Sequence, residues 1–387
     1  MNMQNMLSAA SKQIQPSAIR KFFDIVSEMK DAISLGVGEP DFVTPWHIRE
    51  AGIYSLEKGS THYTSHTGLI ELKSEICKYT KRRFGMEYDF KNQVIVTVGG
   101  SEAIDICIRS VVNPGDEVII PEPSFVCYKP CTILSGGVPV VLQTKAENNF
   151  KITPEELEAV ITPKTKLLIL PYPNNPTGAI MTKEELEKIA EVLKGKDILV
   201  LSDEIYGELS YDKPHVSIAS INEEMYEKTI VVSGFSKAFA MTGWRLGYVL
   251  GNSEVVAAMT KIHQYAIMCA PTTSQYAAVE AMRNGDDDVL NMREEYNYRR
   301  KVALDMLSEI GLECFEPQGA FYLFPSIKST GLTSEQFCEQ LLQDQKVAVV
   351  PGNAFGECGE GFVRMSYCYS IENLKIAIER IGKFVEK

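Results

Sequence analysis

Lys237 is the residue whose setting most clearly indicates chemistry. It follows the β-branched run Thr229–Ser233 in a turn of small and apolar residues, SGFSK, and Arg245 comes eight residues later. Partial desolvation in such a turn lowers the pKa of a lysine and makes its amine a nucleophile. A nearby arginine suits a phosphate, because its guanidinium donates hydrogen bonds in a fork. A solvent-exposed lysine is the alternative, which the apolar surroundings disfavour.

Other polar residues follow neighbouring apolar runs in the same way. Gly100 and Ser101 follow, after Gly99, a run that ends at Val98, and amide groups at a helix start suit a phosphate. Asn175 lies in the proline-rich turn PYPNNPTG, and Asp203 follows the run ILVLS. Each feature alone has a structural alternative: a glycine turn, a rigid loop or a helix cap.

Alternating strands and helices must position these residues. The expected strands are Val94–Val98, Glu117–Ile120, Lys166–Leu170, Ile198–Ser202, Thr229–Ser233 and Arg245–Leu250. Helical periodicity fills the gaps, as in Pro154–Ile161 and Lys183–Lys194. This pattern predicts an α/β fold with a largely parallel sheet covered on both faces. Ligands bind beyond the carboxyl ends of such strands, so the polar residues above should converge.

The pattern changes near Asn284. Asp286–Ile310 predicts one long polar helix, and the apolar runs Cys314–Phe324, Val347–Val350 and Phe362–Tyr367 follow, with helices between and after them. These features indicate a second, smaller α+β domain.

Composition excludes several classes of protein. The net charge of -12 argues against a nucleic-acid binder, which would usually be basic. The nine cysteines include no CxxC pair, so no metal site is expected and reduced thiols fit a cytoplasmic enzyme. We find neither a signal peptide nor an apolar run long enough for a membrane span, so we expect no membrane partner.

The chain resembles the class I aminotransferases, which are fold-type I pyridoxal phosphate (PLP) enzymes. The segment SGFSKAFAMTGWRLGY is similar to their PLP attachment site. LGVGEPDF, YTSHTG, VTVGGSEAI, DEVIIPEPSFVCY, PYPNNPTG, LSDEIYGEL, GAFYLFPSI, VPGNAFGECGEG and FVRMS occur in the family's order. The local pattern is most similar to the bacterial aspartate, aromatic and N-acetyl-diaminopimelate aminotransferases.

The resemblance implies a seven-stranded sheet in a large PLP-binding domain, residues 46–283, and a small domain made of residues 1–45 with 284–387. It also implies three catalytic residues. Lys237 would form a Schiff base with PLP and then move the substrate proton. Asp203 would bind the pyridine nitrogen, and Tyr206 would donate a hydrogen bond to the phenolate oxygen of the cofactor.

Further residues would bind the cofactor or the substrate. The implied cofactor-binding residues are Gly100, Ser101, Phe125, Asn175, Asp203, Tyr206, Ser236, Lys237 and Arg245, together with Tyr63 of a partner in a homodimer. Arg364 would bind the substrate α-carboxylate, with Gly38 and Asn175 beside the substrate.

Two positions depart from the family pattern. Phe125 stands where the best-known aspartate aminotransferases have a ring-stacking tryptophan, and Gly234 stands where they have a phosphate-binding serine. The second departure puts one phosphate contact in doubt. A residue that would bind a side-chain carboxylate is not evident. Arg20 is a candidate, although an exposed arginine is the alternative.

The expected reaction is ping-pong transamination between an L-amino acid and a 2-oxo acid such as 2-oxoglutarate. A PLP-dependent carbon–sulfur β-lyase is the alternative, because it would use the same lysine, aspartate, asparagine and arginines. A transcription factor that carries this fold as a sensor is disfavoured by the charge and by the short segment that precedes LGVGEPDF.

Overall fold

Seven apolar segments pair into one central sheet in the computed structural model, which describes residues 3–16, 29 and 31–386. The strands are β2 (Val94–Thr97), β3 (Glu117–Glu122), β4 (Val138–Gln143), β5 (Thr165–Leu170), β6 (Leu199–Asp203), β7 (Thr229–Gly234) and β8 (Gly247–Leu250). Their order is β2-β8-β7-β6-β5-β3-β4. Only β8 runs antiparallel to its neighbours, so the predicted largely parallel seven-stranded sheet is confirmed.

Both faces of the sheet are buried, as the continuous apolar runs predicted. The described helices are α1 (Ala9–Gln13), α3 (Trp46–Glu57), α4 (Ile70–Phe84), α5 (Gly99–Val111), α6 (Tyr128–Leu134), α7 (Pro154–Val160), α8 (Lys183–Leu193), α9 (Glu223–Lys228), α10 (Ser253–Ala266), α11 (Thr272–Asn284), α12 (Asp286–Glu309), α13 (Ser334–Gln345) and α14 (Ile371–Val385). Along β5, Leu167 and Ile169 join the apolar cluster beneath α5 and α10, whereas Leu168 and Leu170 join the cluster beneath α7 and α8.

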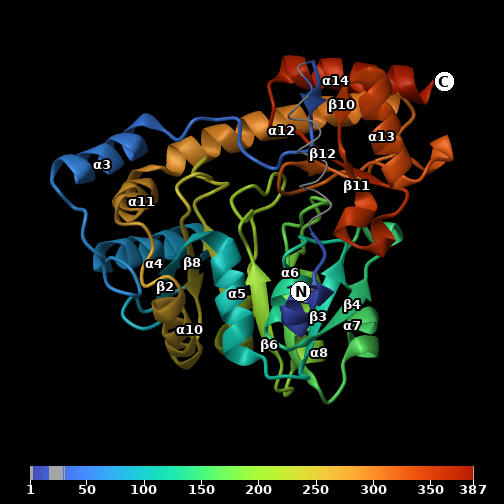
Figure 1. The fold of residues 1–387 in the computed structure, drawn as a ribbon. Coiled ribbons are helices and arrows are strands. Elements are labelled where there is room, and N and C mark those ends of the chain that lie inside the picture. The colour runs from blue at the N-terminus through green and yellow to red at the C-terminus, as the bar shows by residue number, and fades with distance from the viewer. Residues whose placement is uncertain (1–2, 17–28, 30, 387) are drawn as a thin grey trace.

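The smaller part of the molecule contains two short sheets. β1 (Ile33–Ser34) pairs in parallel with β10 (Val347–Ala348), which brings distant parts of the chain together. β11 (Val350–Pro351), β12 (Val363–Ser366) and β9 (Tyr322–Leu323) form an antiparallel sheet. The long helix α12 runs across the top of the view, from above α11 to beneath α14 (Figure 1).

The sequence pattern was wrong about three details. It missed β4, an edge strand in which Pro139 follows the exposed Val138, because a proline inside a short apolar run argues against a strand. Within Cys314–Phe324 only Tyr322 and Leu323 form a strand. The run Val347–Val350 contributes to two different sheets, because Val347 and Ala348 form β10 whereas Val350 begins β11.

Among the described residues, no helix is long and apolar enough to cross a membrane. Those residues also contain no group of three or more histidine, cysteine or acidic side chains that could hold a metal ion.

Candidate active site

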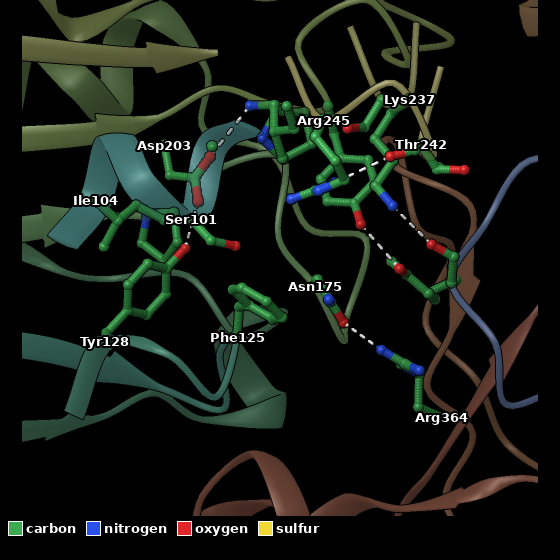
Figure 2. A pocket seen from close by; sticks show the side chains of 18 residues that line it. Ser101, Ile104, Phe125, Tyr128, Asn175, Asp203, Lys237, Thr242, Arg245 and Arg364 are labelled. Atoms are coloured by element: carbon green, nitrogen blue, oxygen red, sulfur yellow. Dashed lines mark hydrogen bonds between the residues drawn. The ribbon is translucent and has the colours of Figure 1, made fainter. Parts of the chain in front are cut away.

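A cavity of about 300 Å³ lies where β2, β3, β5, β6 and β7 end. Eleven of the twelve predicted site residues line it: Gly38, Gly100, Ser101, Phe125, Asn175, Asp203, Tyr206, Ser236, Lys237, Arg245 and Arg364. Figure 2 shows Asp203 and Tyr128 on one side of this cavity and Arg364 on the opposite side. The fold therefore brings together residues that are far apart in the sequence.

Lys237 lies three residues beyond the end of β7, and its amine is held at the cavity. Nζ donates a hydrogen bond to the carbonyl oxygen of Gly38 at 2.7 Å. The ring centroids of Tyr206 and Phe321 lie 6.0 and 5.8 Å from Nζ. Burial lowers the pKa of Lys237 to about 8, so that a substantial share of the amine is neutral near physiological pH.

Asp203 is the last residue of β6, and it is a buried carboxylate. Tyr128 donates its hydroxyl to Oδ2 at 2.7 Å, and the amide of Ile205 donates to Oδ1 at 3.2 Å. Burial raises the pKa of Asp203 to about 6, although both hydrogen bonds oppose this rise. Burial also raises the pKa of Tyr128 well above its ordinary value, so Tyr128 keeps its proton and Asp203 carries a negative charge at neutral pH.

The start of α5 offers amide groups to the cavity. The first amides of a helix have no partner within it, and threonine side chains cap them in α7, α8 and α13. Val98 occupies that position before α5, and its side chain has no atom that can accept a hydrogen bond. The amides of Gly100 and Ser101 can therefore serve an anion, and the hydroxyl of Ser236 and the guanidinium of Arg245 line the same cavity.

Close backbone packing shapes this anion site. Gly99 has a φ of +77°, and a Cβ there would lie 2.7 Å from Nη2 of Arg245. A Cβ on Gly247 would lie 2.6 Å from the carbonyl carbon of Gly99. At Gly234, where the family pattern has a serine, a Cβ would lie 3.0 Å from the Cα of Gly247. Glycine at 234 thus matches the narrow gap between β7 and β8.

Arg364 lies on β12 at the opposite side of the cavity. Nη1 donates to Oδ1 of Asn175 at 2.8 Å, and Nη2 donates to the carbonyl oxygen of Gly36. The guanidinium lies over the rings of Tyr322 and Phe355, at 4.5 and 4.8 Å from their centroids. Its Nε is buried without a hydrogen-bond partner. A buried arginine with a free donor at a cavity suits a carboxylate ligand.

Two tyrosines of the site were missed by the sequence analysis. Tyr128 donates to Asp203, and the hydroxyl of Tyr322 lies 2.8 Å from that of Tyr206. Both occur in motifs that carried the resemblance, DEVIIPEPSFVCY and GAFYLFPSI. Residue type alone could not reveal these contacts, because they join positions 75 and 116 residues apart.

One of the twelve predicted site residues does not meet the others in this chain. Tyr63 is 81% exposed and does not line the cavity. Its role in a partner's site stays a prediction. Arg20, the candidate for a side-chain carboxylate, lies outside the described residues.

Known proteins resemble this chain along nearly its whole length. The family model described as aminotransferase class I and II matches residues 30–381. YugH of Bacillus subtilis is 54% identical over 100% of both chains; its name assigns aminotransferase activity provisionally and gives no substrate. An aspartate aminotransferase of Pyrococcus abyssi is 46% identical over 97% of each chain. The structure of an aromatic aminotransferase of Pyrococcus horikoshii matches with a TM-score of 0.90 and 44% identity, covering 95% of this chain and 99% of that one.

Proposed function

Because the chain belongs to the aminotransferase class I and II family, whose members use PLP, we propose that it moves an amino group between an L-amino acid of the aspartate, aromatic or N-acetyl-diaminopimelate type and a 2-oxo acid such as 2-oxoglutarate. The observation that carries this proposal is the arrangement of three groups around one cavity. They are the amine of Lys237, the buried carboxylate of Asp203 and the unpaired Nε of Arg364.

The residues present fit PLP. The amides at the start of α5 and the guanidinium of Arg245 match the charge of a phosphate. Asp203, a buried acid at the cavity, matches a protonated ring nitrogen. Phe125 lines the same cavity and offers an apolar ring for stacking.

Bound PLP would supply an aldehyde that captures amines and a ring that accepts electrons from the substrate α-carbon. Lys237 would act as the base that takes the α-proton at Nζ and returns it. Asp203 would hold a proton on the ring nitrogen. Arg364, with Asn175, would bind the α-carboxylate and so turn the α-hydrogen toward Lys237. Tyr206 would donate its hydroxyl to the cofactor, with Tyr322 holding that hydroxyl in place.

The lining also supports an apolar or aromatic side chain on the substrate. Ile104, Phe125, Ile205 and Tyr322 contribute apolar surface. Lys237, Arg245 and Arg364 are the cationic residues among the described ones that line the cavity, and each has a proposed role already. A distal carboxylate would therefore need a donor from elsewhere, such as Arg20 or a partner subunit.

A panel of amino donors and 2-oxo acid acceptors tests the proposal. With an amino acid alone, an aminotransferase releases at most one equivalent of 2-oxo acid per site and continues only when an acceptor is added. A β-lyase, in contrast, would release pyruvate and ammonia repeatedly without an acceptor. We expect turnover with 2-oxoglutarate as acceptor and with aromatic donors. Continuous ammonia release would refute the proposal.

Asp203→Asn should lower the turnover number by at least about 10²-fold, the scale of a lost electrostatic contact in an active site. The cofactor-free variant should be as stable as the parent or more stable. The folded-state pKa of about 6 lies above the ordinary value of 3.8, so ionised Asp203 lowers the free energy of unfolding as pH rises from about 4 to 6. Steady-state kinetics and thermal denaturation at pH 7 measure both effects. Tyr128→Phe, which keeps the charge, should lose less activity, and near-normal turnover of a folded Asp203→Asn variant would contradict the assigned role.

We also propose a cytoplasmic homodimer with shared sites, divided within each chain into residues 46–283 and 1–45 with 284–387. Tyr63 and the nearby apolar residues Val43, Trp46 and Tyr54 are exposed in the single chain, which supports a partner surface there. Nine free thiols fit a reducing compartment.

An equal mixture of Tyr63→Phe and Lys237→Ala chains, refolded together, should recover about a quarter of parental activity, because half the dimers would be mixed and each would contain one intact site of two. Each variant refolded alone provides the baseline. Sedimentation of the parent should give twice the mass of the chain. An active monomer, or a mixture no more active than its components, would contradict shared sites.

A further inference from the structure

Glu102 and His263 form a buried pair behind the start of α5. His263 on α10 is fully buried, and its Nδ1 lies 2.5 Å from Oε1 of Glu102. The other carboxylate oxygen of Glu102 accepts a hydrogen bond from the amide of Val98, the residue just before the helix. α10 packs against α5 along this contact. The pair is therefore joined directly to the turn that presents Gly100 and Ser101.

The direction of these bonds leaves the anion site free. Glu102 is on the first turn of α5 but does not line the cavity. It binds an amide that precedes the helix, not the amides of Gly100 or Ser101. A carboxylate at this position would ordinarily compete with a phosphate for the amide groups of the first helical turn. Here Glu102 instead binds the amide of Val98 and fixes the turn from outside the cavity.

His263 is not explained by packing alone. Its Nε2 is buried without a hydrogen-bond partner, a loss of hydrogen bonding that destabilises the folded state. An apolar side chain would avoid that cost. What the imidazole provides is a hydrogen-bond donor to Glu102, whose carboxylate lies near the position of a dianionic phosphate.

We propose that Glu102 and His263 are positioning residues for the cofactor phosphate. Glu102 holds the turn that aims the amides of Gly100 and Ser101, and His263 donates a hydrogen bond that keeps the carboxylate of Glu102 in place and directed away from the phosphate. The inference rests on the proposed function, in which PLP binds at this end of α5. It assigns no contact between either residue and the cofactor.

Equilibrium binding of PLP and of pyridoxal, which lacks the phosphate, to the cofactor-free enzyme tests the proposal without measuring activity. His263→Phe leaves the carboxylate unpaired, so the Kd for PLP should rise about tenfold or more, while the Kd for pyridoxal changes little. Adding Glu102→Gln to that variant removes the charge and keeps an acceptor for Val98. The Kd for PLP should then return close to the parental value.

Glu75→Gln is the matched control. Glu75 is also a paired helix carboxylate, with 9% of its side chain exposed against 10% for Glu102, and it lies outside the cavity. This change should leave the ratio of the two Kd values unaltered. Thermal denaturation checks folding, and His263→Leu, which also cannot donate to Glu102, replaces His263→Phe if the latter does not fold.

Equal losses for PLP and pyridoxal, or no recovery in the double variant, would overturn the inference and show a purely structural pair. If the parent enzyme itself failed to bind PLP, the proposed function would fail, and the inference with it. Parental binding with an unchanged ratio in the variants would refute the inference alone.

Discussion

Lys237→Ala should lower the turnover number by about 10⁴-fold or more, because it removes both a nucleophile and the base that moves the substrate proton. The structure supports this large effect: the amine lies at the cavity, and its pKa is lowered to about 8 by burial. Borohydride reduction of the parent enzyme with PLP, followed by peptide mass mapping, should place the pyridoxyl group on Lys237. The variant should carry no label there.

The capture of PLP by the cofactor-free enzyme should depend on pH with a definite sign. Only the neutral amine attacks an aldehyde, so the rate should rise as pH increases toward about 8 and level off above it. Lys73 is the matched control, because burial lowers its pKa too and its Nζ donates to Thr67 outside the cavity. Lys73→Ala should keep the label on Lys237. A pyridoxyl group on any other lysine would end the assignment.

Arg364→Ala should weaken every amino-acid substrate by about 2–5 kcal/mol in kcat/KM, since it removes a buried charge partner that the α-carboxylates share. Its free Nε and its position between the rings of Tyr322 and Phe355 indicate a preformed carboxylate site. Arg364→Lys should recover little, because an ammonium cannot reproduce two parallel hydrogen bonds or the stacking.

Amines without a carboxylate provide the control for Arg364. Tyramine, which is tyrosine without its α-carboxylate, should be an equally poor donor for the parent and for Arg364→Ala. The loss for aspartate should match the loss for tyrosine when both are measured with the same acceptor. If the variant spared one class of amino acid, the α-carboxylate would bind elsewhere.

The sequence predicted the core of this fold because buried parallel strands leave continuous apolar runs. The edge strand β4 is less clearly marked, since only Leu142 of its six residues is fully buried and Pro139 argues against a strand. The short strands β9, β10 and β11 have two residues each, too few for any periodicity. Pairing with distant segments, not local preference, determines where they begin and end.

The site was predictable to the same degree. Lys237 and Asp203 stand at strand ends, where topology alone makes side chains converge, and motifs similar to those of a family supplied their roles. The contacts of Tyr128 and Glu102 depend on how α6 and α10 pack, which no local pattern in the chain encodes. Tyr63 needs a second chain to be tested at all.

The narrow gap at Gly234 also has an evolutionary consequence. A serine there would bring its Cβ to 3.0 Å from the Cα of Gly247 and 3.1 Å from the carbonyl oxygen of Leu246, so the backbone of β8 would have to shift slightly. A Cβ added to Gly247 would in turn lie 2.6 Å from the carbonyl carbon of Gly99. Substitutions at these three glycines therefore cannot be independent, and their effects should be epistatic.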